Sequence, residues 1–138
     1  MSLDDTRVAL FTHLENNWTT TPIVFDGQTT GDTYVKRSAP WISTYITWAG
    51  QYQKSTAAPS IYVAQNGLLI ITIFARESSG IATIDQYTDS LFALFRGRSI
   101  GNSIIRDLYI DKDEDDGVWQ KRFLSISFTT RTTETITS

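Results

Sequence analysis

The hydrophobic pattern is most regular between Leu68 and Phe95. From Leu68 to Ala75, apolar and mostly β-branched residues occupy both alternating faces, which is typical of a central strand buried on two sides. From Ile81 onward the spacing changes. At about 100° per residue the apolar side chains fill an arc of about 160°, and the polar side chains lie outside it. We therefore predict a central strand followed by an amphipathic helix, and expect the rest of the chain to pack on this segment.

A second helix is predicted over residues 3–18. Its apolar positions fall on one helical face and are Leu3, Leu10, Phe11, Leu14 and Trp18. Arg7 lies within this face, where its aliphatic stem can pack while its guanidinium reaches an edge, a backbone carbonyl or a neighbouring subunit.

Two strands are predicted between this helix and the central strand. A short one at residues 23–25 is followed by an Asp26-Gly27 turn signal, and a longer one spans roughly residues 34–53. In the longer strand, alternation places Trp41 and Tyr45 on one face and an aliphatic set on the other. The aromatic face has two interpretations: cover for a sheet edge or helix, or an intermolecular contact, because aromatic residues are enriched at interfaces.

Turn signals divide the remainder of the chain. We predict a loop of small and polar residues at 54–60, and Asn66-Gly67 is the strongest hairpin signal in the sequence. After the amphipathic helix we predict strands at 103–110 and 118–129, joined by an acidic tip at 111–117, with 130–138 as an edge or a flexible tail.

These elements predict one α+β domain over residues 1–138. Its mainly antiparallel sheet has about five strands with two helices packed on it, in the order α-β-β-β-α-β-β. The length of 138 residues fits a single domain.

Composition narrows the classes of function. The net charge is −3, the sequence pI is near 5.0, and the twelve Lys and Arg residues are scattered along the chain, which argues against sequence-specific nucleic-acid binding. The absence of cysteine excludes disulfides, thiolate nucleophiles and cysteine-based zinc sites. No stretch approaches the ~18 apolar residues of a membrane span, and the start of the chain lacks the apolar core of a signal peptide, so we expect neither membrane insertion nor export.

Candidate catalytic motifs fail on their context. Residues 97–101 match the G-x-S-x-G pattern, but a predicted helix precedes them and a strand follows, the reverse of a nucleophile elbow. His13, the single histidine, lies far upstream and is interpreted as a packed or surface residue. We therefore predict no enzyme activity, no cofactor and no metal.

The acidic tip has three interpretations: a solvated hairpin end, a patch that recognises a basic partner, or a divalent-ion site. Its carboxylates are Asp111, Asp113, Glu114, Asp115 and Asp116. Alternate acids at 111, 113 and 115 resemble the start of a calcium loop. However, the glycine falls at the seventh position of that pattern and Arg122 occupies the twelfth, where a glutamate belongs.

Taken together, the chain resembles the tail terminator (minor tail, tail completion) proteins of long-tailed bacteriophages. The likeness rests on hydrophobic and glycine patterns in four stretches: the first helix with residues 18–26, Trp41–Trp48, Asn66–Phe74, and Ser79–Phe95. It spans nearly the whole chain.

The resemblance implies a structural virion protein without catalytic function. It would form a homo-hexameric ring on the head-proximal end of the tail tube, stop tube growth and present a surface for head–tail joining, after assembly in the host cytoplasm. Its partners would be itself, the tail tube protein and a head-completion protein, because a closed ring needs different complementary patches. Candidate ring contacts are Arg7, Trp41, Tyr45, Asp85, Asp89 and Arg96, and candidate docking residues for a partner are Asp111, Asp113, Glu114, Asp115 and Asp116.

Two alternatives remain open from the sequence. A head-completion or neck protein of the same particle would also bind ring to ring. In a different class, exposed Trp and Tyr side chains could stack on sugars in a carbohydrate-binding module.

Overall fold

The computed structural model describes residues 3–25, 39–57, 60–76 and 80–135. The helices are α1 (Leu3–Asn17) and α3 (Gly80–Phe95). The strands are β1 (Ile23–Phe25), β2 (Trp41–Ala57), β3 (Ser60–Arg76), β4 (Ser99–Ile100), β5 (Ser103–Asp115) and β6 (Trp119–Thr135). Both predicted helices and the central strand are therefore present at the expected positions.

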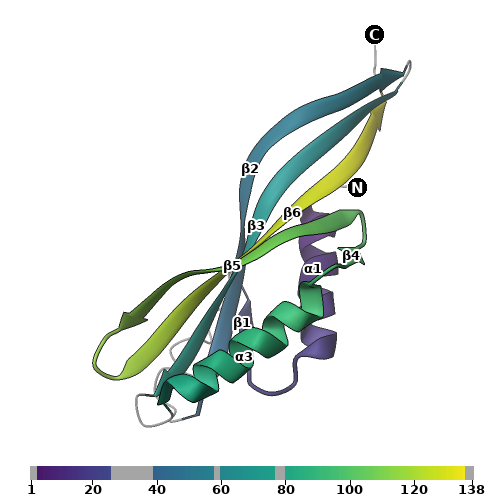
Figure 1. Cartoon of the computed structure of the whole chain (residues 1–138). Coiled ribbons are helices and arrows are strands. Elements are labelled where there is room, and N and C mark those ends of the chain that lie inside the picture. Colours follow the sequence, from purple (N-terminus) through teal and green to yellow (C-terminus); the bar gives the residue numbers. More distant parts are fainter. Residues whose placement is uncertain (1–2, 26–38, 58–59, 77–79, 136–138) are drawn as a thin grey trace.

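The described strands form one six-stranded sheet in the order β1-β2-β3-β6-β5-β4. β1 pairs with β2 in parallel, and every other neighbouring pair is antiparallel. The sheet is strongly twisted and curled, and its strands diverge toward two opposite ends of the molecule (Figure 1).

The predicted five-stranded, mainly antiparallel sheet was therefore wrong in strand number and arrangement. The additional strand, β4, has only two residues, which is too short to carry an alternation signal. The sheet is mixed because β1 and β2 pair in parallel. A strand of three residues has no local pattern that specifies which strand it pairs with or in which direction. The mixture of helices and sheet still places the chain roughly in the α+β class.

Two predicted loops were also wrong. Asn66 and Gly67 do not form a hairpin turn, because they lie inside β3, where Gly67 pairs with Trp48 on one side and Phe128 on the other. Residues 54–57 continue β2 rather than forming a loop, and the following pair of residues, 58–59, lies outside the described part. The Asp26-Gly27 turn also lies outside it.

The final hairpin is longer than predicted at both ends. β5 continues through most of the acidic stretch to Asp115, and β6 begins at Trp119, so the turn is only three residues long. Residues 130–135, expected as an edge or a tail, continue β6 along β3, where Thr135 pairs with Ser60.

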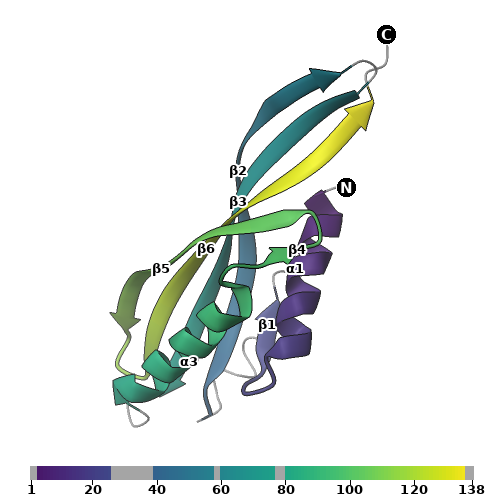
Figure 2. The ribbon, with the colours of Figure 1, turned by 45° about the vertical axis from the view of Figure 1, so that its right-hand side comes forward.

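The main core lies between the helices and one face of the sheet. On β3 this face is formed by Leu69, Ile71 and Ile73, all fully buried. Both helices cover it (Figure 2). His13 of α1 contacts α3, because its Nε2 lies 2.7 Å from the carbonyl oxygen of Leu94. The alternating residues of β6 extend the face as predicted, and the helices complete the core; these residues are Leu124, Ile126, Phe128, Leu10, Leu14, Ile84, Leu91 and Phe95.

The opposite face, which we call the back face, has its own aromatic cluster. Trp41 of β2 stacks on Phe74 of β3, with ring centroids 3.9 Å apart and planes 2° from parallel. Trp119 packs edge-on against both rings, and Val24 completes the cluster. At this end of the back face, the aromatic side chains of neighbouring strands therefore bury one another, and neither α1 nor α3 covers them.

Candidate interaction surfaces

A buried arginine organises the end of the sheet beside α3. Arg122 lies on the helix-facing side of β6, and only 9% of its side chain is exposed. Its guanidinium donates to both carboxylate oxygens of Asp113 on β5, at 2.8 and 3.1 Å, and to Asp85 of α3 at 2.6 Å. A third acceptor, the hydroxyl of Thr88, lies at 3.3 Å. One cation therefore ties the helix to two strands.

The contacts between Arg122 and its carboxylate partners shift the pKa values of Asp113 and Arg122. The hydrogen bonds from Arg122 hold the pKa of Asp113 below its ordinary value, and the reciprocal contact with Asp113, followed by that with Asp85, raises the pKa of Arg122. Asp113 and Asp85 are therefore used within the chain, although the sequence analysis placed one among docking residues and the other among ring contacts.

The acidic residues of the final hairpin are partly neutralised by neighbouring cations. Lys112 pairs with Glu114 at 3.0 Å, and Lys121 pairs with Asp116 at 3.3 Å. Asp111 is exposed and lies at an irregularity of the β5 ladder.

Two of these carboxylates also hold the turn. Asp115 accepts a hydrogen bond from the backbone of Gly117, while Asp116 accepts from the backbone N–H groups of Trp119 and Val118. These backbone bonds lower the pKa of Asp116. The turn is consequently an exposed acidic hairpin end whose backbone is held by hydrogen bonds to its own carboxylates.

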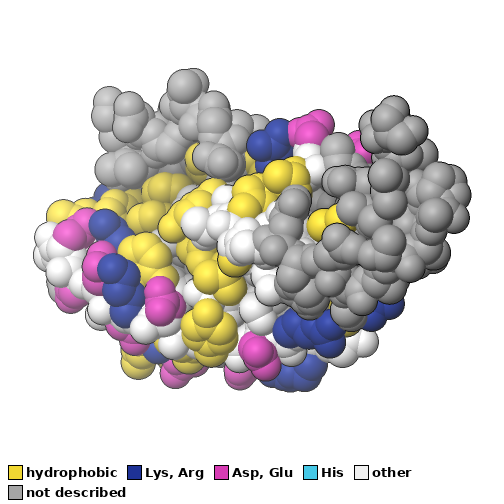
Figure 3. Space-filling view, turned by 90° about the horizontal axis from the view of Figure 1, so that it is seen from above, with side chains coloured by type: hydrophobic (Ala, Val, Ile, Leu, Met, Phe, Trp, Pro, Cys, Tyr) yellow, Lys and Arg dark blue, Asp and Glu magenta, His cyan; other side chains and the backbone are white. Residues whose placement is uncertain are grey.

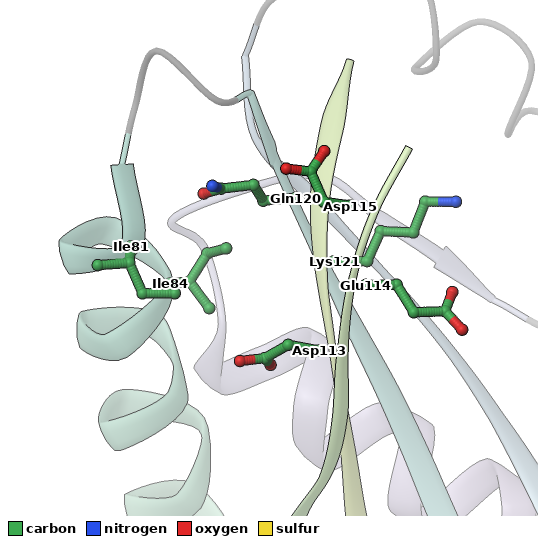
Figure 4. A pocket seen from close by; sticks show the side chains of 7 residues that line it. All are labelled: Ile81, Ile84, Asp113, Glu114, Asp115, Gln120 and Lys121. Atoms are coloured by element: carbon green, nitrogen blue, oxygen red, sulfur yellow. The ribbon is translucent and has the colours of Figure 1, made fainter. Parts of the chain in front are cut away.

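A small hollow separates the hairpin from the start of α3. It has a volume of about 180 Å³ and is lined by Ile81, Ile84, Asp113, Glu114, Asp115, Gln120 and Lys121. Figure 4 shows Asp113 and Gln120 directed toward the helix and Glu114 directed to the other side of the hairpin. No group of three or more His, Asp or Glu side chains within the described ranges is arranged to hold a metal ion.

The aromatic residues singled out from the sequence have different surroundings. Trp41 is 5% exposed within its stack on Phe74, whereas Tyr45, on the same face of β2, is 41% exposed. The register places Tyr45 in one row across the back face with Ile70, Ser125 and Tyr109, and Tyr109 is 42% exposed at the far end. Trp41 therefore packs within the back face of the sheet, whereas the side chain of Tyr45 is accessible on that face.

The other predicted ring residues lie on or directly beside the two helices. Arg7 is exposed on α1 and pairs with Asp4 one turn away. Asp89 and Arg96 are exposed, Asp89 on α3 and Arg96 directly after its last turn. The structure thus does not gather the six candidates into one patch. In the view from above, hydrophobic side chains occupy the centre of the described surface, and acidic and basic side chains lie toward its margins (Figure 3).

Sequence reasoning missed two features. Arg122 shares the buried face of Leu124, Ile126 and Phe128, and a lone cation in an apolar alternation was the available signal. The second is a group of arginines near the start of β5, defined below, which are distant in sequence and therefore resembled scattered charge.

Comparisons with known proteins bear on the fold alone. No protein-family model matches the chain, and no curated protein matches it. A solved structure of a protein whose name states no function aligns with a TM-score of 0.65 and 15% sequence identity, covering 94% of this chain and 96% of the other. Identity at that level supports a shared fold. No helix among the described residues is long and apolar enough to span a membrane.

Proposed function

We propose that this chain is a structural protein of a long-tailed bacteriophage, a tail terminator. In this proposal copies of the chain form a closed ring, a hexamer, on the head-proximal end of the tail tube, where the ring ends tube polymerisation and receives a head-completion protein. The activity requires complementary surfaces and no catalysis, cofactor or metal. The sequence resemblance described above motivates this choice.

The structural observation that carries the proposal is a sheet extension. Beyond the start of β5, the strands β2, β3 and β6 continue as a three-stranded segment, with Ala57 paired to Ser60 and Ser60 paired to Thr135. This extension projects away from both helices, as both ribbon views show (Figures 1 and 2). A thin sheet gains stability when its faces and edges are packed, so a projecting extension favours a protein whose surroundings are other subunits.

The outer edges of the sheet favour the same interpretation. Described strands pair with the outer edge of β2 only at residues 42–44, through β1, and β4 pairs with the outer edge of β5 only at Ser103 and Ile104. Within the described part, each copy therefore presents two different edges that are only partly paired. Different surfaces on opposite sides suit head-to-tail contacts, which can close into rings.

A carbohydrate-binding role receives less support. Stacking on sugars requires accessible aromatic faces, and the ring of Trp41 is occupied by Phe74 and buried.

Assembly measurements test the proposal. Light scattering of the purified chain over a wide concentration range should give a mass several times 15.6 kDa, and negative-stain images should show rings. Addition of the chain to polymerising tail-tube subunits of the same phage should shorten the tubes and leave one ring on one end. A ring that binds without limiting tube length would instead favour a neck protein, and a monomer that leaves tubes unchanged would refute the proposal.

A further inference from the structure

Three arginines lie near the start of β5 although they belong to different segments of the chain. The carbonyl of Arg98, just before β4, accepts a hydrogen bond from Ile105 of β5. Arg106 follows directly on β5, and Arg131 of β6 donates its backbone N–H to Asn102. All three side chains are exposed. We call Arg98, Arg106 and Arg131 the arginine cluster.

The cluster differs in its ionic contacts from the basic residues elsewhere on the first helix and the final hairpin. There, Arg7, Lys112, Lys121 and Arg122 each pair with a carboxylate. Among the described residues, no carboxylate pairs with any member of the cluster. Within the described ranges the three guanidinium groups therefore have no ion-pair partner, in a molecule whose net charge is −3.

A hollow lies beside the cluster on the back face. Its polar side chains are linked by two consecutive hydrogen bonds. Arg106 Nε donates to the Thr129 hydroxyl at 3.4 Å, and that hydroxyl donates to Asn66 Oδ1 at 2.9 Å. One end of the guanidinium is thus anchored, and its remaining N–H groups are left for an acceptor such as a carboxylate. Leu68, Ser127 and the acidic residue Asp107 also line the hollow.

The complementary charge lies at the other end of β5. The turn between β5 and β6 projects from the body of the molecule (Figure 1), and its backbone is held by Asp115 and Asp116. At about 3.3 Å per residue, Arg106 and Asp115 are roughly 30 Å apart along the strand, so the two charged ends cannot meet within one copy.

We propose that the arginine cluster and its hollow bind the acidic β5–β6 turn of a second copy of this chain. The contact rests on the proposed ring, for which it supplies the head-to-tail interface, and it assigns the turn to contacts within the ring rather than to docking of another partner. Charge complementarity selects the occupant, because the turn presents several exposed carboxylates, whereas the three arginines stand beside one acidic residue, Asp107. Contact between two different surfaces of identical copies is the kind that closes a ring.

Charge reversal in two separate variants tests this contact. The first carries Arg106→Glu and Arg131→Glu, and the second carries Asp111→Lys and Glu114→Lys, two acids that do not hold the turn. Each variant alone should associate at least about tenfold more weakly than wild type in light scattering, because the first places like charges against each other and the second removes the net negative charge of residues 111–117. Mixing the two should restore association between unlike variants, since the acidic turn of the first fits the arginines of the second. Glu15→Lys, an exposed reversal on α1, is the matched control and should leave the mass unchanged.

The outcomes separate this contact from the proposed function. Normal rings from both variants, each shown to be folded by its thermal melt, would overturn the contact and leave the tail role standing. Restored association in the mixture, together with wild-type chain that does not limit tube length, would support the contact and overturn the tail role. If the arginine variant instead lost binding to double-stranded DNA with no change in mass, the cluster would be a phosphate site and the contact would be wrong.

Discussion

Arg122 donates two hydrogen bonds to Asp113, although Arg122 is almost fully buried and Asp113 is 52% exposed. The exposed partner thus compensates a cation that has lost its water, and Asp85 adds a second carboxylate from α3. The desolvation of this cation offsets much of its attraction to the two carboxylates, so its net contribution to stability is smaller than the number of contacts suggests.

Replacement of Arg122 by methionine tests the joint between α3 and the final hairpin. We expect a loss of about 2 kcal/mol in the free energy of unfolding, below the roughly 3–5 kcal/mol of a fully buried pair, because the released carboxylates can regain water. Urea denaturation measures the change. Lys112→Met, which removes an exposed ion pair on the same hairpin, should cost under about 1 kcal/mol, and equal losses from both variants would contradict the role given to Arg122.

Acid should weaken the same joint. Because the pKa of Asp113 is lower in the folded protein than its ordinary value of 3.8, the unfolded chain binds this proton more readily. The stabilisation is therefore complete above that ordinary value and is lost as the pH falls through the lower, folded pKa. Urea midpoints measured from about pH 6 to about pH 2 should decline in the acid range. Asp113→Asn should lower stability at the upper end and reduce the acid decline, and an unchanged decline would show that other groups control it.

Gly67 should tolerate no side chain, for a reason unrelated to turns. A Cβ at this position would lie 2.6 Å from the ring of Phe128, which is 1% exposed. We expect Gly67→Ala to cost about 1–3 kcal/mol through overpacking. Gly50→Ala is the control within β2, because a Cβ there meets no atom within 4 Å. If the loss at Gly67 arises from this clash, a smaller side chain at Phe128 should make the two substitutions non-additive in a double-mutant cycle.

Substitution of Trp41 and of Tyr45 should change the stability of the protein to different extents, although both side chains lie on the same face of β2. Trp41→Ala removes a buried, stacked ring and should cost about 3–5 kcal/mol. Tyr45→Ala removes a ring that is 41% exposed and should change stability by no more than about 1 kcal/mol. Thermal melts measure both, and light scattering of the Tyr45 variant reports whether the exposed ring takes part in association. A large stability loss at Tyr45 would mean that it belongs to the core.

The elements with periodic signals could be predicted from the amino-acid sequence alone. Both helices, the buried face of α3 around Leu91 and Phe95, and the alternation of Leu124, Ile126 and Phe128 follow from the spacing of apolar residues, because burial of one face requires that spacing. The interface residues predicted from the same patterns remain predictions, and two of them, Asp85 and Asp113, are engaged by Arg122.

Where the strands end and which charges pair depends instead on contacts between distant segments. Asn66-Gly67 has the local preference of a turn, but pairing with strands on both sides outweighs that preference and keeps it extended. Likewise the acidic stretch joins β5 because β6 runs beside it and supplies Lys121 and Arg122 as partners. The three members of the arginine cluster belong to different segments, and they come together because pairing across the sheet brings β4 and the start of β5 beside β6, a long-range relationship that no local pattern contains.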